Sequence, residues 1–142
     1  MKRRDTLMRL KRFRVDELKR RMATLDGMRA DLDRKLTDLE ESVVRERQRA
    51  NDSDIGRLAF PSFLRSIESR RENLRNTLKE IDREREQCQG ELQAAYQDLK
   101  SLELATEQQA KRVAEIEARR TQSRVDEMAI VRHLRKHALR QV

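Results

Sequence analysis

The sequence predicts an all-α protein in which two long helices form an antiparallel coiled-coil hairpin. Three observations predict this fold class: 42% of the residues are charged and 3% are aromatic, leucine heptads cover most of the chain, and the one proline interrupts them. So charged a composition leaves too little bulky apolar material for a broad core, whereas a coiled-coil seam needs only about two apolar positions in seven. Disorder is the competing interpretation, but the regular leucine spacing argues against it. One domain over residues 1–142 is expected.

The first helix is predicted from about residue 6 to about residue 50. Its core positions from residue 18 to residue 43 are separated alternately by four and three residues, and seven of the eight are apolar. This repeat is typical of a left-handed coiled coil. The eight positions are Leu18, Met22, Leu25, Arg29, Leu32, Leu36, Leu39 and Val43.

A connection is predicted at about residues 51–61, around Pro61. Proline has no backbone N–H and clashes with the preceding turn, so a helix does not continue through it unbroken. Proline suits the first turn of a new helix, which places the restart near residue 62. A connection of this length can reverse the chain, and a hairpin is then the simplest closed solution. A bent parallel dimer of two chains is the alternative.

The second helix is predicted at about residues 62–138. Its core positions continue the heptad: Leu64, Ile67, Arg71, Leu74, Leu78, Ile81, Arg85, Cys88, Leu92, Ala95, Leu99, Leu102, Thr106, Gln109, Val113 and Ile116. In a hairpin this helix is longer than the first by roughly thirty residues, which form an overhanging C-terminal segment. The arginines at core positions are expected to extend their charged ends to water and to specify the register of the helices.

The net charge of +8 is concentrated at the two ends of the sequence. Residues 1–21 contain ten Lys/Arg and three acids, and residues 111–142 contain nine Lys/Arg and four acids. Residues 1–17 form a basic amphipathic pattern that suits either a membrane or partner surface or a solvated start of the coiled coil. A basic scaffold or non-specific nucleic-acid binder is the alternative function. Because Phe13 is the only aromatic residue in the two basic ends, nucleic acid is not the expected partner.

The sequence does not predict an enzyme, a metal site, a cofactor or a small-molecule substrate. His133 and His137 have the i, i+4 spacing of metal ligands, but no third ligand accompanies them and basic residues surround them. Cys88 falls at a core position, where a cysteine acts as a small apolar residue. No apolar run approaches the roughly 18 residues of a membrane span, so a cytoplasmic protein is expected.

Four strings, in their order and spacing, resemble FliJ-type flagellar export proteins, particularly the alphaproteobacterial form. They are residues 4–17 (RDTLMRLKRFRVDE), residues 60–63 (FPSF) followed by residues 70–74 (RRENL), residues 99–103 (LKSLE) and residues 124–129 (RVDEMA). The resemblance implies an antiparallel two-helix coiled coil that acts as a non-catalytic stalk of the flagellar type III export apparatus. The partners it implies are the export ATPase hexamer, the cytoplasmic domain of the export gate and export chaperones. The implied location is the cytoplasmic side of the inner membrane, peripheral at the apparatus.

The resemblance also implies two contact surfaces. The gate-contact face of the family has the spacing i, i+4, i+7, i+11, which corresponds here to Phe63, Ile67, Arg70 and Leu74. For Ile67 and Leu74 the alternative is plain packing within the seam. The ATPase-facing end is expected to combine cations with apolar contacts. Its residues are Lys2, Arg3, Arg4, Arg12, Val125, Met128, Ile130, Arg132 and Arg135.

Overall fold

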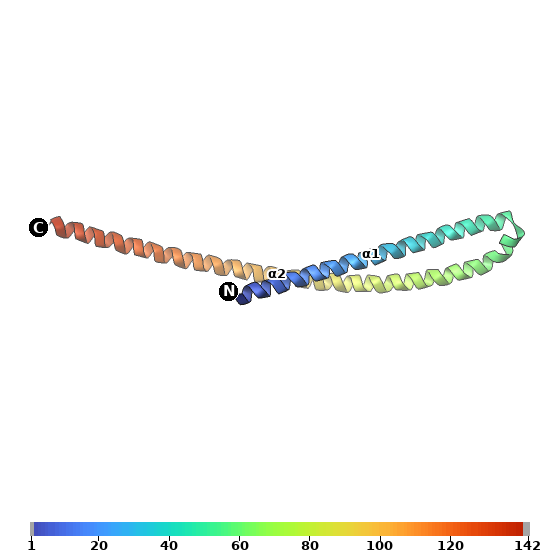
Figure 1. Ribbon diagram of the computed structural model, residues 1–142, viewed down its shortest axis with the longest axis horizontal. Helices are drawn as coiled ribbons and strands as arrows, with labels where there is room; N and C mark the ends of the chain where they lie inside the picture. The colour runs from blue at the N-terminus through green and yellow to red at the C-terminus, as the bar shows by residue number, and fades with distance from the viewer. Residues whose placement is uncertain (1, 141–142) are drawn as a thin grey trace. The chain divides into compact units, whose positions relative to one another are not determined.

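The computed structural model describes residues 2–140, as two long helices that follow one another almost directly. Helix α1 extends over Lys2–Asp52 and helix α2 over Asp54–Arg140, with Ser53 between them. Figure 1 shows α1 beside the first part of α2, running in the opposite direction. The predicted all-α hairpin of two helices is therefore confirmed.

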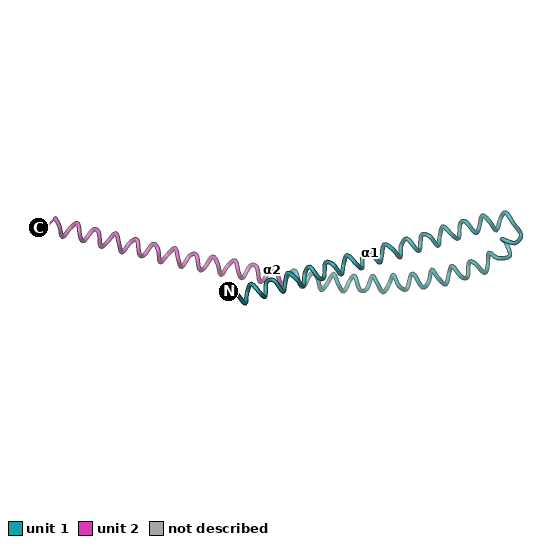
Figure 2. The backbone as a smooth tube through the Cα atoms, in the orientation of Figure 1, with its two compact units in different colours: residues 1–97 teal, residues 98–142 magenta. Residues whose placement is uncertain are grey.

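The chain divides into two units, residues 1–97 and residues 98–142 (Figure 2). One domain over residues 1–142 stays a prediction. The first unit contains the hairpin, and the second contains the remainder of α2. Every residue from 107 to 140 in the second unit is exposed. Three residues of the predicted domain lie outside the described residues: Met1, Gln141 and Val142.

The seam of the hairpin buries the positions that the heptad predicts. The most buried side chains are Val15, Leu18, Leu25, Leu32, Val43, Ala50, Ile67, Ile81 and Cys88, each at most 8% exposed. Leu18, Leu25 and Cys88 pack together, and Met22, Leu92 and Ala95 surround them. Seven of these nine residues are predicted core positions, and Val15 and Ala50 continue the same spacing along α1. The last three predicted core positions, Gln109, Val113 and Ile116, lie in the second unit and are exposed.

The three arginines at core positions of the seam each meet an acid of the opposite helix. The contacts are Arg29 Nε to Asp82 Oδ1 at 2.9 Å, Arg71 Nη2 to Glu40 Oε1 at 2.9 Å, and Arg85 Nε to Asp26 Oδ1 at 2.7 Å. The contact of Arg85 is a hydrogen bond, whereas that of Arg29 is close without hydrogen-bond alignment. All three arginines keep part of their side chain in water, as expected for long stems that cross a narrow seam.

The turn between the helices is held by hydrogen bonds around Ser53. Its N–H donates to the carbonyl of Arg49 at 3.2 Å, which closes the last turn of α1. Its hydroxyl accepts the N–H of Gly56 at 3.0 Å, which caps the first turn of α2. The Arg57 side chain donates from Nε to the carbonyl of Ala50 at 3.3 Å. Polar groups left open at both helix ends are thereby satisfied.

The connection predicted at about residues 51–61 is wrong in its extent. Only Ser53 is non-helical between the two helices, and the predicted helix bounds of about 6–50 and 62–138 are too short. Pro61 lies inside α2 rather than at its start. A proline inside a helix removes one hydrogen bond and is accommodated by a local bend, so it does not have to end the helix. The capping side chain, and not the proline, fixes where α2 begins.

At Gly56 the start of α2 lies close to the end of α1. A Cβ atom at this position would lie 2.7 Å from the Arg49 carbonyl oxygen, 2.9 Å from the Ser53 hydroxyl and 3.1 Å from the Ala50 Cα. Two of these three atoms are backbone and have little freedom to move. The turn therefore requires a residue without a side chain here.

Candidate partner-binding surfaces

The four residues predicted to contact the export gate lie in different environments on α2. Ile67 is buried in the seam with 3% exposure. Phe63 and Leu74 are half-buried, and Arg70 is exposed. A partner on this side of the hairpin would therefore reach Phe63, Arg70 and Leu74 but not the buried Ile67 side chain.

Two of these residues also line an open groove of about 370 Å³ between the helices. Lys35, Asp38 and Leu39 come from α1, and Arg70, Asn73 and Leu74 come from α2. The two leucines make its apolar part, and the other four residues are polar or charged. Such a groove suits one apolar side chain of a partner with polar contacts around it.

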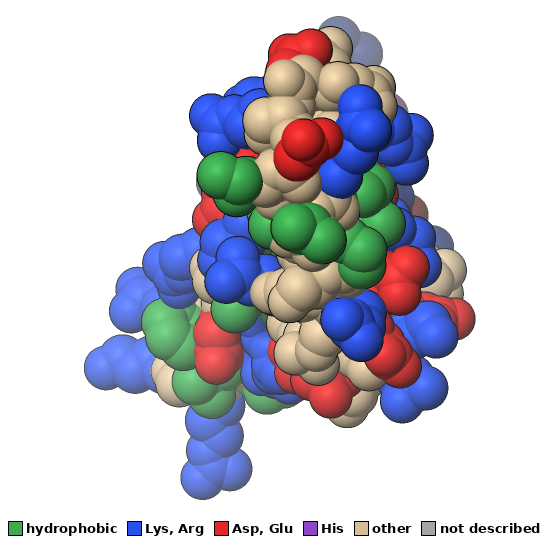
Figure 3. All heavy atoms as spheres, turned by 90° about the vertical axis from the view of Figure 1, so that its right-hand side faces the viewer, with side chains coloured by type: hydrophobic (Ala, Val, Ile, Leu, Met, Phe, Trp, Pro, Cys, Tyr) green, Lys and Arg blue, Asp and Glu red, His purple; other side chains and the backbone are tan. Residues whose placement is uncertain are grey.

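The turn end of the hairpin carries two strongly exposed apolar side chains, which the sequence does not single out. Ile55 is 80% exposed and Leu58 is 84% exposed. Figure 3 looks onto this end and shows hydrophobic side chains gathered between basic and acidic ones. The signal that would have found them is the capping pair Ser53–Asp54, because it places both residues on a helix instead of in a loop.

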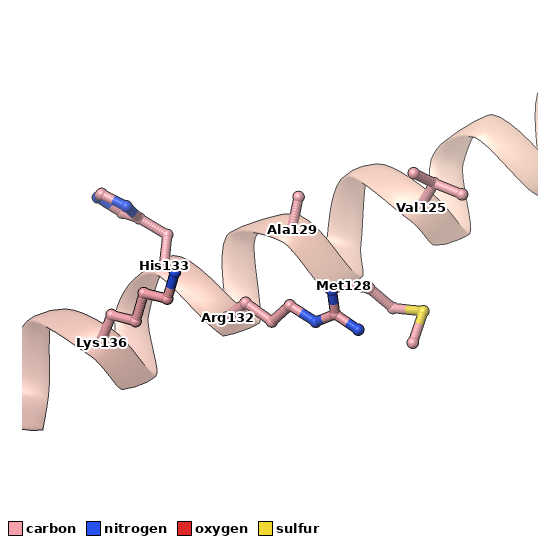
Figure 4. A pocket seen from close by; sticks show the side chains of 6 residues that line it. All are labelled: Val125, Met128, Ala129, Arg132, His133 and Lys136. Carbon is pink, nitrogen blue, oxygen red and sulfur yellow. The ribbon is translucent and has the colours of Figure 1, made fainter.

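The C-terminal part of α2, which lies in the second unit, presents a mixed apolar and basic face. Val125 is 53% exposed and Met128 is 60% exposed. Figure 4 shows the Arg132 side chain extending along the helix toward Met128. Six residues line this face: Val125, Met128, Ala129, Arg132, His133 and Lys136. Ile130 is 59% exposed and, like the predicted Arg135, is not among them.

The two histidines of this segment stack rather than converge on a common point. The rings of His133 and His137 are 6.4 Å apart between centroids and 12° from parallel. Within residues 2–140, no group of three or more His, Cys, Asp or Glu side chains lies close enough to hold a metal ion.

The first turns of α1 carry the remaining predicted ATPase contacts in the first unit. Lys2, Arg3, Arg4 and Arg12 are all exposed. Three apolar residues accompany them: Leu7 is 43% exposed, Leu10 60% and Phe13 61%. The basic segment of α1 and the face on α2 belong to different units, so each is a surface in its own right.

Polar contacts at the buried cysteine and at Tyr96 stabilise the hairpin. The Cys88 side chain is 2% exposed, and its thiol donates to the Leu18 carbonyl at 3.5 Å. The Lys19 ammonium lies 5.1 Å from the centre of the Tyr96 ring. A side-chain hydrogen bond with Tyr96 raises the pKa of Lys19 above its ordinary value of 10.5.

Comparison with protein families gives one match, to the family described as flagellar FliJ protein, over residues 1–138. The chain matches no curated protein and no solved structure. Neither helix, over its described residues, has a stretch long and apolar enough to cross a membrane. The family match covers nearly all of the 142 residues and agrees with the two-helix hairpin. The chain therefore belongs to the FliJ family and is a component of the flagellar export apparatus.

Proposed function

We propose that the protein is a non-catalytic stalk that binds the hexameric export ATPase and the cytoplasmic domain of the export gate. Membership of the FliJ family supports its place in the export apparatus. The observation that carries the stalk role is the exposure of every residue from 107 to 140 of α2. A helical segment that leaves apolar side chains exposed along its length implies a partner that covers them. Export chaperones are proposed as further partners.

The face around Val125, Met128 and Arg132 is the proposed docking surface for the ATPase ring. It offers apolar side chains for burial and a cation that attracts an acidic surface (Figure 4). Such charges mainly raise the association rate and are screened by salt. The other predicted ATPase contacts lie outside this face and stay predictions: Lys2, Arg3, Arg4, Arg12, Ile130 and Arg135.

The test is to titrate the full chain into the export ATPase of the same cell and to measure both affinity and hydrolysis rate. The double variant Val125→Ser, Met128→Ser is expected to weaken binding by at least about tenfold, because two half-exposed apolar side chains no longer become buried. Leu104→Ser is the matched control, since Leu104 is 52% exposed in the same unit. Ile130→Ser shows whether the contact extends around the helix. Neither binding nor a rate change with the unaltered protein would refute the stalk role.

The groove between Leu39 and Leu74, with Phe63 on the same helix as Leu74, is the proposed docking surface for the export gate. Phe63 is half-buried, so part of its ring remains available to a partner. An apolar residue of the gate would fill the groove beside Leu74, and Arg70 would pair with an acid at its edge.

Phe63→Ala and Leu74→Ala separate docking from packing. Docking predicts that each variant weakens binding to the isolated gate domain while the unfolding free energy changes by less than the binding free energy. Leu58→Ala is the control, because Leu58 is 84% exposed and lies outside the groove. If both variants lose stability and binding in equal measure, Phe63 and Leu74 act only in the seam.

A further inference from the structure

The first turns of α1 carry an exposed apolar stripe. Leu7, Leu10 and Phe13 are 43%, 60% and 61% exposed and are spaced by three residues. At about 100° per residue they fall within an arc of about 120° on the helix. Leu7 and Leu10 also share an open hollow with Lys2, Arg3 and Thr6.

Cations far outnumber acids within this segment of α1. Residues 2–14 contain seven Lys/Arg and one acid, Asp5. Lys2, Arg3, Arg4 and Arg9 are exposed. Arg14 pairs with Glu17 and Glu91 at 3.6 Å each, so the excess of positive charge ends where the acids of the hairpin begin.

The seam already holds this segment as a helix. Val15, two residues after Phe13, is 3% exposed, and Leu18 is 1% exposed. Two residues along a helix correspond to a turn of about 200°, so Phe13 points away from the side that Val15 buries. A partner of the stripe therefore meets a preformed surface and does not have to order the chain.

We propose that residues 2–14 of α1 bind the surface of a bilayer that contains anionic phospholipids. A helix lies in a bilayer interface when Phe and Leu enter the boundary of the acyl chains and Lys and Arg reach the phosphates beside them. The stripe and its cations provide both sets of contacts in one segment. An acidic protein surface is the alternative partner, and the variants below distinguish it from a bilayer. The surface is separate from the α2 face proposed for the ATPase.

The test is co-sedimentation of the full chain with vesicles of phosphatidylcholine mixed with phosphatidylglycerol, and with vesicles of phosphatidylcholine alone. Binding is expected only to the mixed vesicles, and it should weaken as salt is raised. Phe13→Ser should reduce the partition coefficient about tenfold. Arg3→Gln with Arg4→Gln should reduce it about 25-fold, from about fivefold for each cation.

The matched control variants alter exposed residues of the same kinds that lie outside the stripe. Leu58→Ser removes an apolar side chain that is 84% exposed, and Arg34→Gln removes a cation whose side chain is 75% exposed. Both should bind vesicles within about twofold of the unaltered chain, since neither residue lies in the stripe. Circular dichroism checks that every variant keeps its helices.

Three results would overturn the proposal. Equal binding to both kinds of vesicle would show that anionic lipid is not recognised. Vesicle binding that is insensitive to Phe13→Ser and to the arginine pair would place the contact elsewhere. Vesicle binding that is absent, together with ATPase binding that these same variants weaken, would assign the segment to an acidic protein partner. Because the ATPase arm is measured separately on the α2 variants, either proposal can fail alone.

Discussion

Two glycine-to-alanine changes should act on stability in opposite directions. At Gly56, the new Cβ would lie 2.7 Å from the Arg49 carbonyl oxygen and 3.1 Å from the Ala50 Cα. Both are backbone atoms of α1, so relief requires the helices to move apart at the turn. Overpacking of this kind costs about 1–3 kcal/mol. At Gly27, no atom lies within 4 Å of the new Cβ. Alanine there should stabilise the helix by about 1 kcal/mol.

Urea unfolding followed by circular dichroism measures both free energies. Because both variants make the same chemical change in a helix, the propensity gain is common to both, and they should differ in unfolding free energy by the overpacking cost, about 1–3 kcal/mol. Gly90→Ala is a second control, because its Cβ also meets nothing within 4 Å. If Gly56→Ala stabilises the chain as much as Gly27→Ala, the tight approach at the turn is not a constraint on folding, and the account of Gly56 is refuted.

Further variants and a salt titration check the core, the ion pairs and the alternative function. Leu18→Ala should cost about 2–5 kcal/mol in urea unfolding, because Leu18 is 1% exposed; Leu10→Ala, at a 60% exposed residue, should stay within about 0.5 kcal/mol. Asp26→Ala removes the acceptor of Arg85 on the opposite helix and should cost about 1 kcal/mol. Asp31→Ala removes the partner of Arg34 on the same helix, where both side chains are more exposed, and should cost less. Titration with duplex DNA should show binding that falls steeply as salt rises; binding that survives physiological salt would favour the nucleic-acid role over the stalk.

The heptad made the seam predictable because it repeats one simple requirement many times. Each core position has the same environment, so a single misplaced residue does not change the pattern. This is why Leu18 and Cys88 could be placed in the core from spacing alone, and why the structure buries both. The interpretation of the core-position arginines rests on the same logic, since a two-helix seam leaves their long side chains a path to water.

The turn could not be predicted in the same way, because it depends on single contacts rather than on a repeat. Pro61 is the more conspicuous residue, yet the bond from Gly56 to the Ser53 hydroxyl sets the start of α2. Placing residues 51–61 in a loop also concealed the exposed Ile55 and Leu58. Spacing along one helix cannot tell whether a residue such as Ile67 faces the other helix or a partner, because apolar residues are expected at both kinds of contact. That distinction needs the burial that the structure supplies.

The charged contacts across the seam have a mechanical consequence. The three pairs share one midpoint in the sequence, between residues 55 and 56: Arg29 with Asp82, Arg85 with Asp26, and Arg71 with Glu40. If the helices slipped by one heptad, Arg29 would come opposite Arg75 in one direction, and Arg71 would come opposite Arg47 in the other. At these two positions attraction would then turn into repulsion. The three ion pairs thus resist sliding of one helix along the other, so a force along one helix is transmitted to the other.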